Sequence, residues 1–441
     1  MKFQYIFLTL FGVAAVVAVI VFAKMPSKAD PKIAGAQGTV TIWGTFSGSG
    51  GLDKMINTFN QDYKDTFSVN YAYHDPKTFD RDIVEALASG KGPDILLLPD
   101  DLILRHTDKI ELIPYSATSG VTPGWFQGTF IQAAEIYLRD QGIAALPFAI
   151  DPMVMYWNRD LFNNASITET PKHWDELLTL APKLTLRDPK TGDIIQSAVS
   201  FGEYVNVDNA KDIIAMLFLQ VGVHIVNMES GHLVVDLITR RTNEVVVNQD
   251  VASAFRFFMD FSNPLKNIYS WNRALPKSRD NFINGNLAMY FGYASEYKLL
   301  QAKNPHLNFA VAPVPLPRGA KVDITFAHMH GLAVMKSSRN KGTAFVAVQR
   351  LLDPKSSGEF AEVFNLPPVR RDLLNKRPTD AALSVFYDSA IRARTWLDPR
   401  PEETNTAFQN IVESVSSGRN PVSEAIDSLS NKLSALLQYY Q

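Results

Sequence analysis

The sequence predicts an α/β protein with two lobes, and three observations support this prediction. The chain has 441 residues, of which 46% are hydrophobic, so it is long enough to form two separate cores. Short apolar runs of strand length alternate with amphipathic helices along most of it. The run ALPFAIDPMVMYWNRD at 145–160 places Asp151 between Pro147 and Pro152, which is typical of a strand that passes from one lobe into the other. An ordinary sheet strand with loop prolines is the alternative.

Charge and cysteine content exclude several classes of protein. Lys and Arg total 43 while Asp and Glu total 45, so the basic surface of nucleic-acid-binding proteins is missing and no nucleic-acid partner is expected. The chain has no cysteine. This excludes disulfides, thiolate metal sites, a cysteine nucleophile and the cysteine-linked anchor of bacterial lipoproteins.

Residues 1–38 predict a membrane segment followed by a tether. No residue from 3 to 23 is charged, and about 20 apolar residues can span a bilayer as a helix. A cleaved signal peptide is the alternative, but the apolar run is long for one and the best cleavage candidate, at 27–29, lies well beyond its end. We favour an uncleaved anchor in the cell membrane with the folded part outside the cytoplasm, although the lysines after the span conflict with the positive-inside rule.

The first folded elements follow a strand, loop and helix order. The β-branched run 39–43 predicts a strand, a glycine-rich loop follows at 46–51, and the apolar residues of 52–59 have the spacing of one helix face. This order exposes backbone N–H groups at the place where open α/β sheets bind ligands. A plain flexible loop is the alternative.

Two carboxylates follow a strongly apolar strand. Residues 68–73 predict a strand, 79–87 a helix, and the run DILLL at 94–98 a strand covered on both faces. Asp100 and Asp101 come directly after this last run. They are candidates to accept hydrogen bonds from ligand hydroxyls, and the solvated start of a helix is the alternative.

The later elements repeat the same alternation. Residues 282–293 predict a short helix and a buried strand, and 325–335 predict a strand that crosses between the lobes a second time. Residues 234–247 predict a hairpin. Helices are predicted at 170–178, 208–222, 251–261, 294–302, 342–352, 358–364, 381–392, 404–415 and 421–440.

Six motifs in order resemble the extracellular solute-binding proteins of ABC importers, of the maltose- and oligosaccharide-binding type. The likeness runs from about residue 39 to 440, and the missing lipoprotein cysteine is the departure from it. The motifs are ALASGKGPDI at 86–95, LPFAIDPMVMYWNRDLF at 146–162, TPKHWDELL at 170–178, FINGNLAMYFG at 282–292, GLAVMKSSRNKGTAFVAVQRLL at 331–352 and FNLPPVRRDLL at 364–374.

The resemblance implies a type II periplasmic-binding-protein fold, in which two α/β lobes close on a ligand by hinge bending. On this basis we assign 39–149 and 279–325 to the first lobe, and 150–278 and 326–441 with the C-terminal helices to the second. It also implies a monomer that captures a small-molecule solute and delivers it to ABC permease subunits. A carbohydrate is favoured over an anionic or peptide-like solute. The alternatives are a sensory or structural binding module without a transporter, and a polysaccharide-active enzyme.

Sugar sites combine flat aromatic rings with hydrogen-bonding polar side chains. Core packing is the alternative role for each aromatic candidate, a hinge hydrogen bond for Asp151, and a surface ion pair with Asp372 for Arg370. An anionic solute would instead favour the glycine-rich loop and Arg370. The ligand-binding candidates are Trp43, Phe46, Ser49, Asp100, Asp101, Asp151, Tyr204, Trp271, Tyr293, Arg370 and Trp396.

No catalytic residue, metal or cofactor is expected. Ser295 and Lys298, with the Lys-Thr-Gly run at 190–192, contain the parts of a penicillin-binding active site, but in the wrong order. His328 and His330 place two imidazoles on one face of a strand, yet no further ligand has the spacing of a metal site. A glycosidase needs only two carboxylates, so the enzyme alternative stays open.

Overall fold

The computed structural model describes residues 36–47, 51–116, 120–229, 231–241 and 244–440. The predicted membrane segment at 3–23 and the candidate Ser49 lie outside the described residues. Within the described ranges, no helix is long and apolar enough to cross a bilayer.

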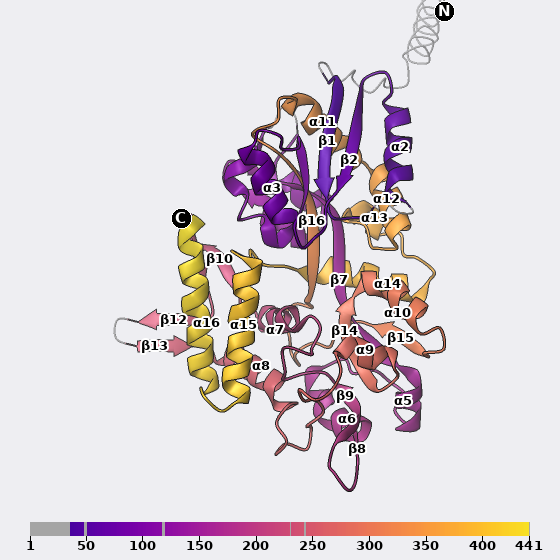
Figure 1. Ribbon diagram of the computed structural model, residues 1–441, viewed down its shortest axis with the longest axis vertical. Coiled ribbons are helices and arrows are strands. Elements are labelled where there is room, and N and C mark those ends of the chain that lie inside the picture. The colour runs from indigo at the N-terminus through magenta and orange to yellow at the C-terminus, as the bar shows by residue number, and fades with distance from the viewer. Residues whose placement is uncertain (1–35, 48–50, 117–119, 230, 242–243, 441) are drawn as a thin grey trace, which may run out of the picture.

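A mixed sheet extends through both lobes and forms the frame of the described chain (Figure 1). Eight of its strands follow one another in the order β2, β1, β3, β16, β7, β14, β9 and β8, while β15 pairs with β7 and β17 with β16. The strands are β1 (Gly38–Gly44), β2 (Phe67–Tyr73), β3 (Ile95–Pro99), β7 (Leu146–Asn158), β8 (Leu186–Arg187), β9 (Ile194–Val199), β14 (Leu287–Tyr293), β15 (Phe309–Ala312), β16 (Thr325–Val334) and β17 (Ala393–Arg394).

Strand β7 changes partners half-way along, as the sequence predicts. Its residues from 146 to 152 pair antiparallel with β16, whereas residues from 153 to 158 pair with β14 and β15. Strand β16 also spans the junction, because its residues 330–334 pair with β3 in the first lobe. Both predicted crossings between the lobes are therefore confirmed, and they lie side by side.

The first lobe packs its helices against β1, β2, β3 and the lobe-one parts of β7 and β16. The predicted helix face at 52–59 is confirmed, since its four apolar residues are buried in this core. The helices are α2 (Leu52–Asp62), α3 (Phe79–Ala88), α4 (Pro123–Thr129), α11 (Lys341–Leu351), α12 (Pro354–Phe364) and α13 (Arg371–Leu374). The first lobe also contains a small sheet of β4 (Ile113–Pro114), β5 (Leu138–Arg139) and β6 (Gly142–Ile143).

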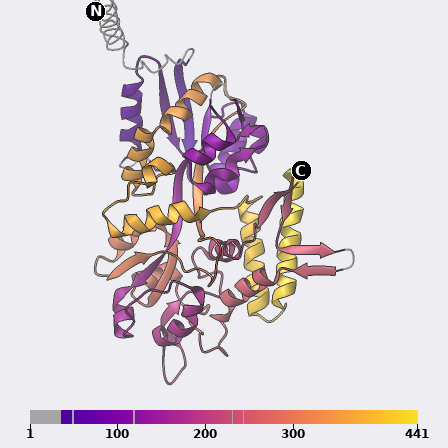
Figure 2. The same cartoon turned by 180° about the vertical axis from the view of Figure 1, so that it is seen from behind.

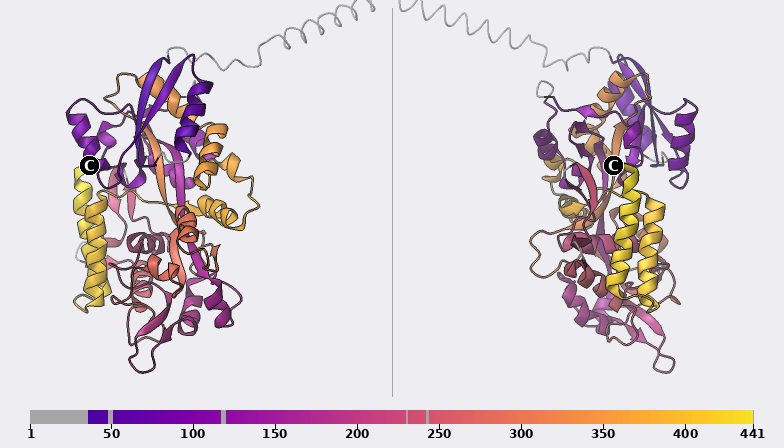
Figure 3. Two further views of the ribbon diagram at one scale, coloured as in Figure 1. Left: turned by 45° about the vertical axis from the view of Figure 1, so that its right-hand side comes forward. Right: turned by 90° about the vertical axis from the view of Figure 1, so that its left-hand side faces the viewer.

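The second lobe is larger and ends in a pair of long helices that lie along its side (Figure 3). Instead of one hairpin at 234–247, two hairpins form: β10 (Val226–Glu229) with β11 (His232–Val235), and β12 (Ile238–Arg241) with β13 (Glu244–Val247). The helices are α5 (Arg159–Asn164), α6 (Leu177–Leu184), α7 (Ala210–Gln220), α8 (Gln249–Asp260), α9 (Ser278–Ile283), α10 (Tyr297–Lys303), α15 (Pro401–Ser416) and α16 (Val422–Leu437).

The two cores divide the chain differently from the predicted lobe boundaries. Buried residues of the segment 279–325, including Leu287 and Val314, belong to the core of the second lobe, and those from Ala327 to Leu374, apart from Leu366, belong to the first. The assignment of 279–325 to the first lobe and of 326–374 to the second is thus corrected. The reason is that β14 pairs with the second half of β7, so the chain returns to the first lobe only along β16.

Helix α14 (Ala381–Arg392) lies across the waist between the lobes, where Figure 2 shows it as a transverse helix. Its Phe386 is buried in the second core and its Ala390 in the first. This helix and the two crossing strands therefore connect the lobes.

Candidate functional site

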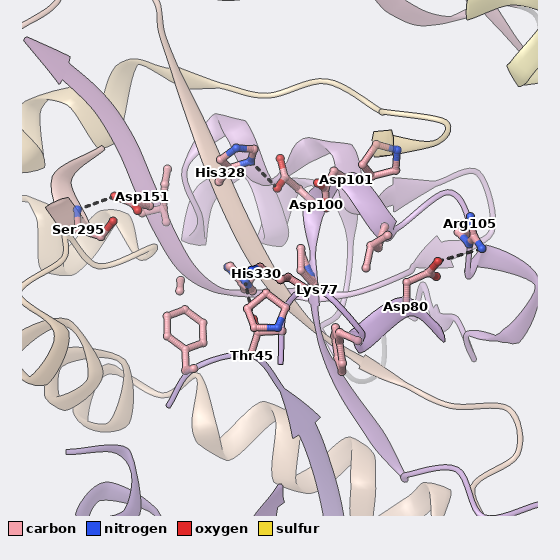
Figure 4. Close-up of a pocket in the computed structure, with 18 of the residues that line it drawn as sticks. Thr45, Lys77, Asp80, Asp100, Asp101, Arg105, Asp151, Ser295, His328 and His330 are labelled. Atoms are coloured by element: carbon pink, nitrogen blue, oxygen red, sulfur yellow. Dashed lines mark hydrogen bonds and ion pairs between the residues drawn. The ribbon is translucent and has the colours of Figure 1, made fainter. Parts of the chain in front are cut away.

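A cavity of about 720 Å³ lies where the two lobes meet (Figure 4). A smaller cavity of about 460 Å³ adjoins it, because both are lined by Asp101, His328, Pro401 and Glu402. We call the two together the interlobe cleft. Its walls come from both lobes and from the crossing strands, so its shape depends on how the lobes are placed.

Strand ends and the two crossing strands position the polar side chains of the cleft. Asp100 and Asp101 form a short 3-10 turn directly after β3. Asp151 and His328 face each other as register partners in the β7–β16 ladder, so their side chains emerge at the same level of the sheet. From the second lobe, Lys211 and Asp212 in the first turn of α7 line the smaller cavity.

His328 lies between two carboxylates from opposite lobes. Its Nδ1 is 3.3 Å from Oδ1 of Asp100, and its Nε2 is 3.4 Å from Oδ2 of Asp212. Burial lowers the pKa of His328, but Asp212 and Asp100 outweigh this effect and raise the pKa well above its usual 6.5. Burial likewise raises the pKa of Asp212, yet His328 and Lys211 lower it below its ordinary value.

Asp101 differs from its neighbours because its carboxylate has no hydrogen-bond partner among the described residues, although it lines both parts of the cleft. Burial and the adjacent Asp100 raise its pKa to about 7. Burying a carboxylate without hydrogen-bond donors is energetically unfavourable, so a donor from a ligand would stabilise it. It is therefore the group of the cleft best prepared to accept a hydrogen bond from a ligand.

Asp151 combines both roles that the sequence leaves open. Its Oδ1 accepts a hydrogen bond of 2.9 Å from the backbone N–H of Ser295, which joins the crossing strand to the second lobe. The same carboxyl lines the larger cavity. Burial raises its pKa to about 6, against the opposing effect of the Ser295 hydrogen bond.

A buried ion pair supports the second-lobe wall. Lys211 donates to Asp398, and Thr404 donates to both oxygens of the same carboxylate at 2.9 and 2.8 Å. Asp398 is only 2% exposed. The pair fixes the start of α15 against α7, and with it the residues Pro401 and Glu402 that line the cleft.

Three predicted aromatic candidates lie at or behind the cleft. Phe46 lines the larger cavity with its ring 4.7 Å from that of His330, and Tyr204 lines the smaller one. Tyr293 is 8% exposed and stands behind His328, with its hydroxyl donating to Asp212 at 2.7 Å. Tyr293 therefore supports His328 and Asp212 from behind and does not line the cleft itself.

Four other candidates do not line the cleft. Trp271 is completely buried in the second core, where its Nε1 donates to Asn206, and Trp396 is 4% exposed in the same core. Trp43 packs on the ring of His74 at 4.1 Å. Arg370 forms a bidentate ion pair with Asp372, as its alternative role predicts. Packing in the second core keeps Trp271 and Trp396 from the cleft, whereas contacts with His74 and Asp372 hold Trp43 and Arg370 away from it.

Several cleft residues are not among the sequence-based candidates. In the sequence, His328 and His330 stand out only as a weak metal motif. The described residues hold no group of three or more side chains placed to bind a metal ion. Asp212 and Glu402 stand in the first turns of helices, where an acidic residue is ordinary. Only the contact between distant segments distinguishes them.

Comparisons with known proteins agree with this architecture. A family model described as bacterial extracellular solute-binding protein matches residues 54–383. The comparison with curated protein sequences gave no match.

Several solved structures share the fold at low sequence identity. The sugar-binding protein MalE from Xanthomonas citri is 18% identical, with a TM-score of 0.72 over 91% of this chain and 98% of that one. The cyclic α-maltosyl-1,6-maltose-binding protein from Arthrobacter globiformis is 15% identical, with a TM-score of 0.70 over 91% and 99%. A solute-binding protein from Thermotoga lettingae bound with α-D-tagatose is 20% identical, with a TM-score of 0.64 over 91% and 100%. These similarities confirm the predicted two-lobed fold.

Proposed function

Because the chain belongs to the bacterial extracellular solute-binding proteins, which are binding proteins and not enzymes, we propose that it captures a sugar or oligosaccharide in the interlobe cleft. The lobes would close around the solute by bending at β7 and β16. The larger cavity, at about 720 Å³, lies within the range of roughly 300–1,000 Å³ that is common for small-molecule sites.

The observation that carries this proposal is the carboxylate of Asp101, which no described residue partners, in a cleft that also contains Asp151 and Glu402. Sugar hydroxyls are hydrogen-bond donors, and hydrogen bonds to ionised acceptors are stronger than neutral ones. Phe46 adds an aromatic surface at the edge of the cavity, where the apolar face of a sugar ring can pack.

The charge of the cleft argues against an anionic solute. Six carboxylates of the described chain line the larger cavity against three cations, Lys77, Arg105 and Arg400, and the two arginines are already paired with Asp80 and Glu403 respectively. Arg370, the predicted anion partner, stands away from the cleft in its pair with Asp372. Two of the structures with a similar fold contain a bound sugar, α-D-tagatose in one and maltotetraose in the other, which supports the carbohydrate class for this chain.

We further propose that the predicted span at 3–23 tethers the folded part to the membrane on its extracytoplasmic side, and that the loaded protein delivers its solute to ABC permease subunits. The length of the apolar run supports the tether. Family membership supports the delivery.

A thermal-shift screen of the detergent-solubilised full chain against mono-, di- and oligosaccharides tests the ligand class. A ligand of the folded state raises the melting temperature increasingly with its concentration. We expect such a shift with at least one sugar. Shifts with phosphate esters or peptides, and none with any sugar, would contradict the carbohydrate proposal.

A further inference from the structure

Three side chains form a bridge across the cleft, and we call Asp100, His328 and Asp212 the interlobe bridge. Asp100 follows β3 in the first lobe and Asp212 belongs to α7 in the second, while His328 lies on the crossing strand β16. Figure 4 shows the contact between the imidazole and Asp100 on the cleft wall. The two ring nitrogens are 3.3 and 3.4 Å from the carboxylates of Asp100 and Asp212.

Both carboxylates are held in place from behind. Asp100, only 2% exposed, accepts hydrogen bonds from Thr395 and from the backbone N–H of Met329. Asp212 accepts a hydrogen bond of 2.7 Å from the hydroxyl of Tyr293. The two anions are therefore oriented toward the ring before any solute arrives.

Only a protonated imidazole can serve both partners. A neutral ring has one N–H, so it could donate to Asp100 or to Asp212 but not to both, whereas an imidazolium donates from each nitrogen. The positive charge of the imidazolium also offsets the electrostatic repulsion between the two carboxylates, which would otherwise face each other across the junction.

We propose that His328 is a positioning residue for lobe closure: as an imidazolium it ties Asp100 to Asp212 and holds the lobes together, and loss of its proton releases them. This inference concerns regulation of the site described above and rests on the proposed function.

The sign of the pH effect follows from the number of carboxylates around the ring. In the closed form both bridge carboxylates contact His328, and an opening that withdraws α7 leaves Asp100 alone, so closure raises the pKa of His328. The closed form is favoured below the open-form pKa and loses this advantage as the pH rises through the closed-form pKa, which lies well above 6.5. The other ionisable groups that act electrostatically on the bridge include Asp101, Asp151, Lys211, Tyr293 and His330.

These other groups titrate differently. The carboxyls of Asp101 and Asp151, with pKa values raised to about 7 and about 6, gain protons as the solution becomes acidic. His330, whose pKa burial lowers to about 4, is neutral over the same range. Lys211, whose pKa, despite burial, its neighbouring carboxylates raise above 10.5, and Tyr293, whose pKa burial raises well above 10, keep their protons up to pH 10. Release of the bridge on the alkaline side is therefore assigned to His328.

The absence of native cysteine allows a direct measurement of closure. Asn57→Cys on α2 and Lys183→Cys on α6 place spin labels on exposed positions of the two lobes. Pulsed dipolar distances are measured on the full chain in lipid nanodiscs, without solute, from pH 6 to pH 10. If closure raises the pKa of His328 by about one unit, the closed-to-open ratio falls about tenfold across the transition.

Two variants test the bridge, and thermal melts verify that each is folded. His328→Gln should abolish the pH-dependent change, and Asp212→Asn should abolish most of it, because closure then no longer brings a second carboxylate to the ring and no longer raises the pKa of His328. His74→Gln is the matched control, since His74 pairs with Asp82 at 3.1 Å within the first lobe; it should keep the response of the parent.

A pH-independent distance in the parent, or an unchanged response in His328→Gln, would overturn the inference. Sugar addition separates this outcome from failure of the proposed function. If sugar still shortens the distance while the pH response is absent, only the bridge proposal fails. If no sugar changes the distance or the melting temperature, the carbohydrate-binding proposal fails whatever the pH response.

Discussion

The carboxylate of Asp151 accepts a hydrogen bond of 2.9 Å from the backbone N–H of Ser295. Asp151 lies at the point where β7 exchanges β16 for β14 as its partner, and Ser295 follows directly after β14. The contact therefore closes the junction between a crossing strand and the second lobe. It also orients an anion whose exposed side faces the cleft.

Asp151→Asn should stabilise the protein at alkaline pH. The raised pKa, about 6 in the fold against an ordinary 3.8, means that stability is lost as the pH rises from about 4 to about 6, because the folded state retains the proton longer. Asn keeps the acceptor for Ser295 and removes the charge. We expect the free energy of unfolding at pH 8 to rise by at most about 3 kcal/mol, and no gain at pH 4, in urea titrations.

The control is Asp65→Asn, in an exposed turn before β2, which should change stability by less than about 0.5 kcal/mol at either pH. An equal gain for Asp151→Asn at both pH values would show that the charge is not the cause.

Asp101→Asn should weaken sugar binding. Asp101 has no hydrogen-bond partner in the described ranges, so a solute hydroxyl would be its donor, and a bond to a charged acceptor contributes about 1.5–3 kcal/mol. Isothermal titration calorimetry should show an affinity loss of about 10- to 100-fold. In the parent the affinity should rise as the pH passes through about 7, where Asp101 ionises, and the variant should lose that dependence.

Asp372→Asn, which removes the surface partner of Arg370, is the matched control and should leave sugar affinity unchanged. Unaltered affinity in Asp101→Asn would remove this carboxylate from the binding site.

Trp271→Phe should reduce stability and leave the sugar affinity of the folded protein unchanged. The ring is completely buried, and its Nε1 donates to Asn206 at 3.2 Å. Loss of this bond and of ring volume should cost about 1–3 kcal/mol in urea unfolding. Trp125→Phe, at a ring that is 38% exposed, should cost less than about 0.5 kcal/mol. Weaker sugar binding at unchanged stability would instead return Trp271 to the ligand site.

Gly331→Ala should strain the second crossing strand. A Cβ at Gly331 would lie 2.8 Å from Cβ of Ala145 and 2.9 Å from Cζ of Tyr137, and the β7–β16 register shifts at this residue. Because these neighbours are buried, we expect a loss of about 1–3 kcal/mol in thermal or urea unfolding. Gly342→Ala, where a Cβ would meet nothing within 4 Å in α11, should be neutral or stabilising. Similar effects of the two variants would contradict crowding as the cause.

Much of the fold could be predicted from local pattern. The strands at 39–43, 68–73 and 94–98 and the helix face at 52–59 follow from hydrophobic periodicity, which is a property of neighbouring residues. The prolines around Asp151 mark the first crossing for the same reason, since they restrict the backbone of their own neighbours.

The lobe assignment of 279–325 required the tertiary structure. Strand β14 is apolar on both faces and would suit either core. Strand β14 belongs to the second lobe because it pairs with the second half of β7, which lies more than a hundred residues earlier in the sequence. No local sequence pattern predicts this pairing.

The candidate site divides in the same way. Turn and strand patterns are local, and they place Asp100, Asp101 and Asp151 at strand ends or in a crossing strand without any knowledge of the fold. The meeting of His328 with Asp212 in the cleft, and the burial of Trp271 in the core, depend on contacts between distant segments. A buried ring and a ring on a cleft wall have the same local sequence requirements, whereas the difference between them depends on which distant segment covers the side chain.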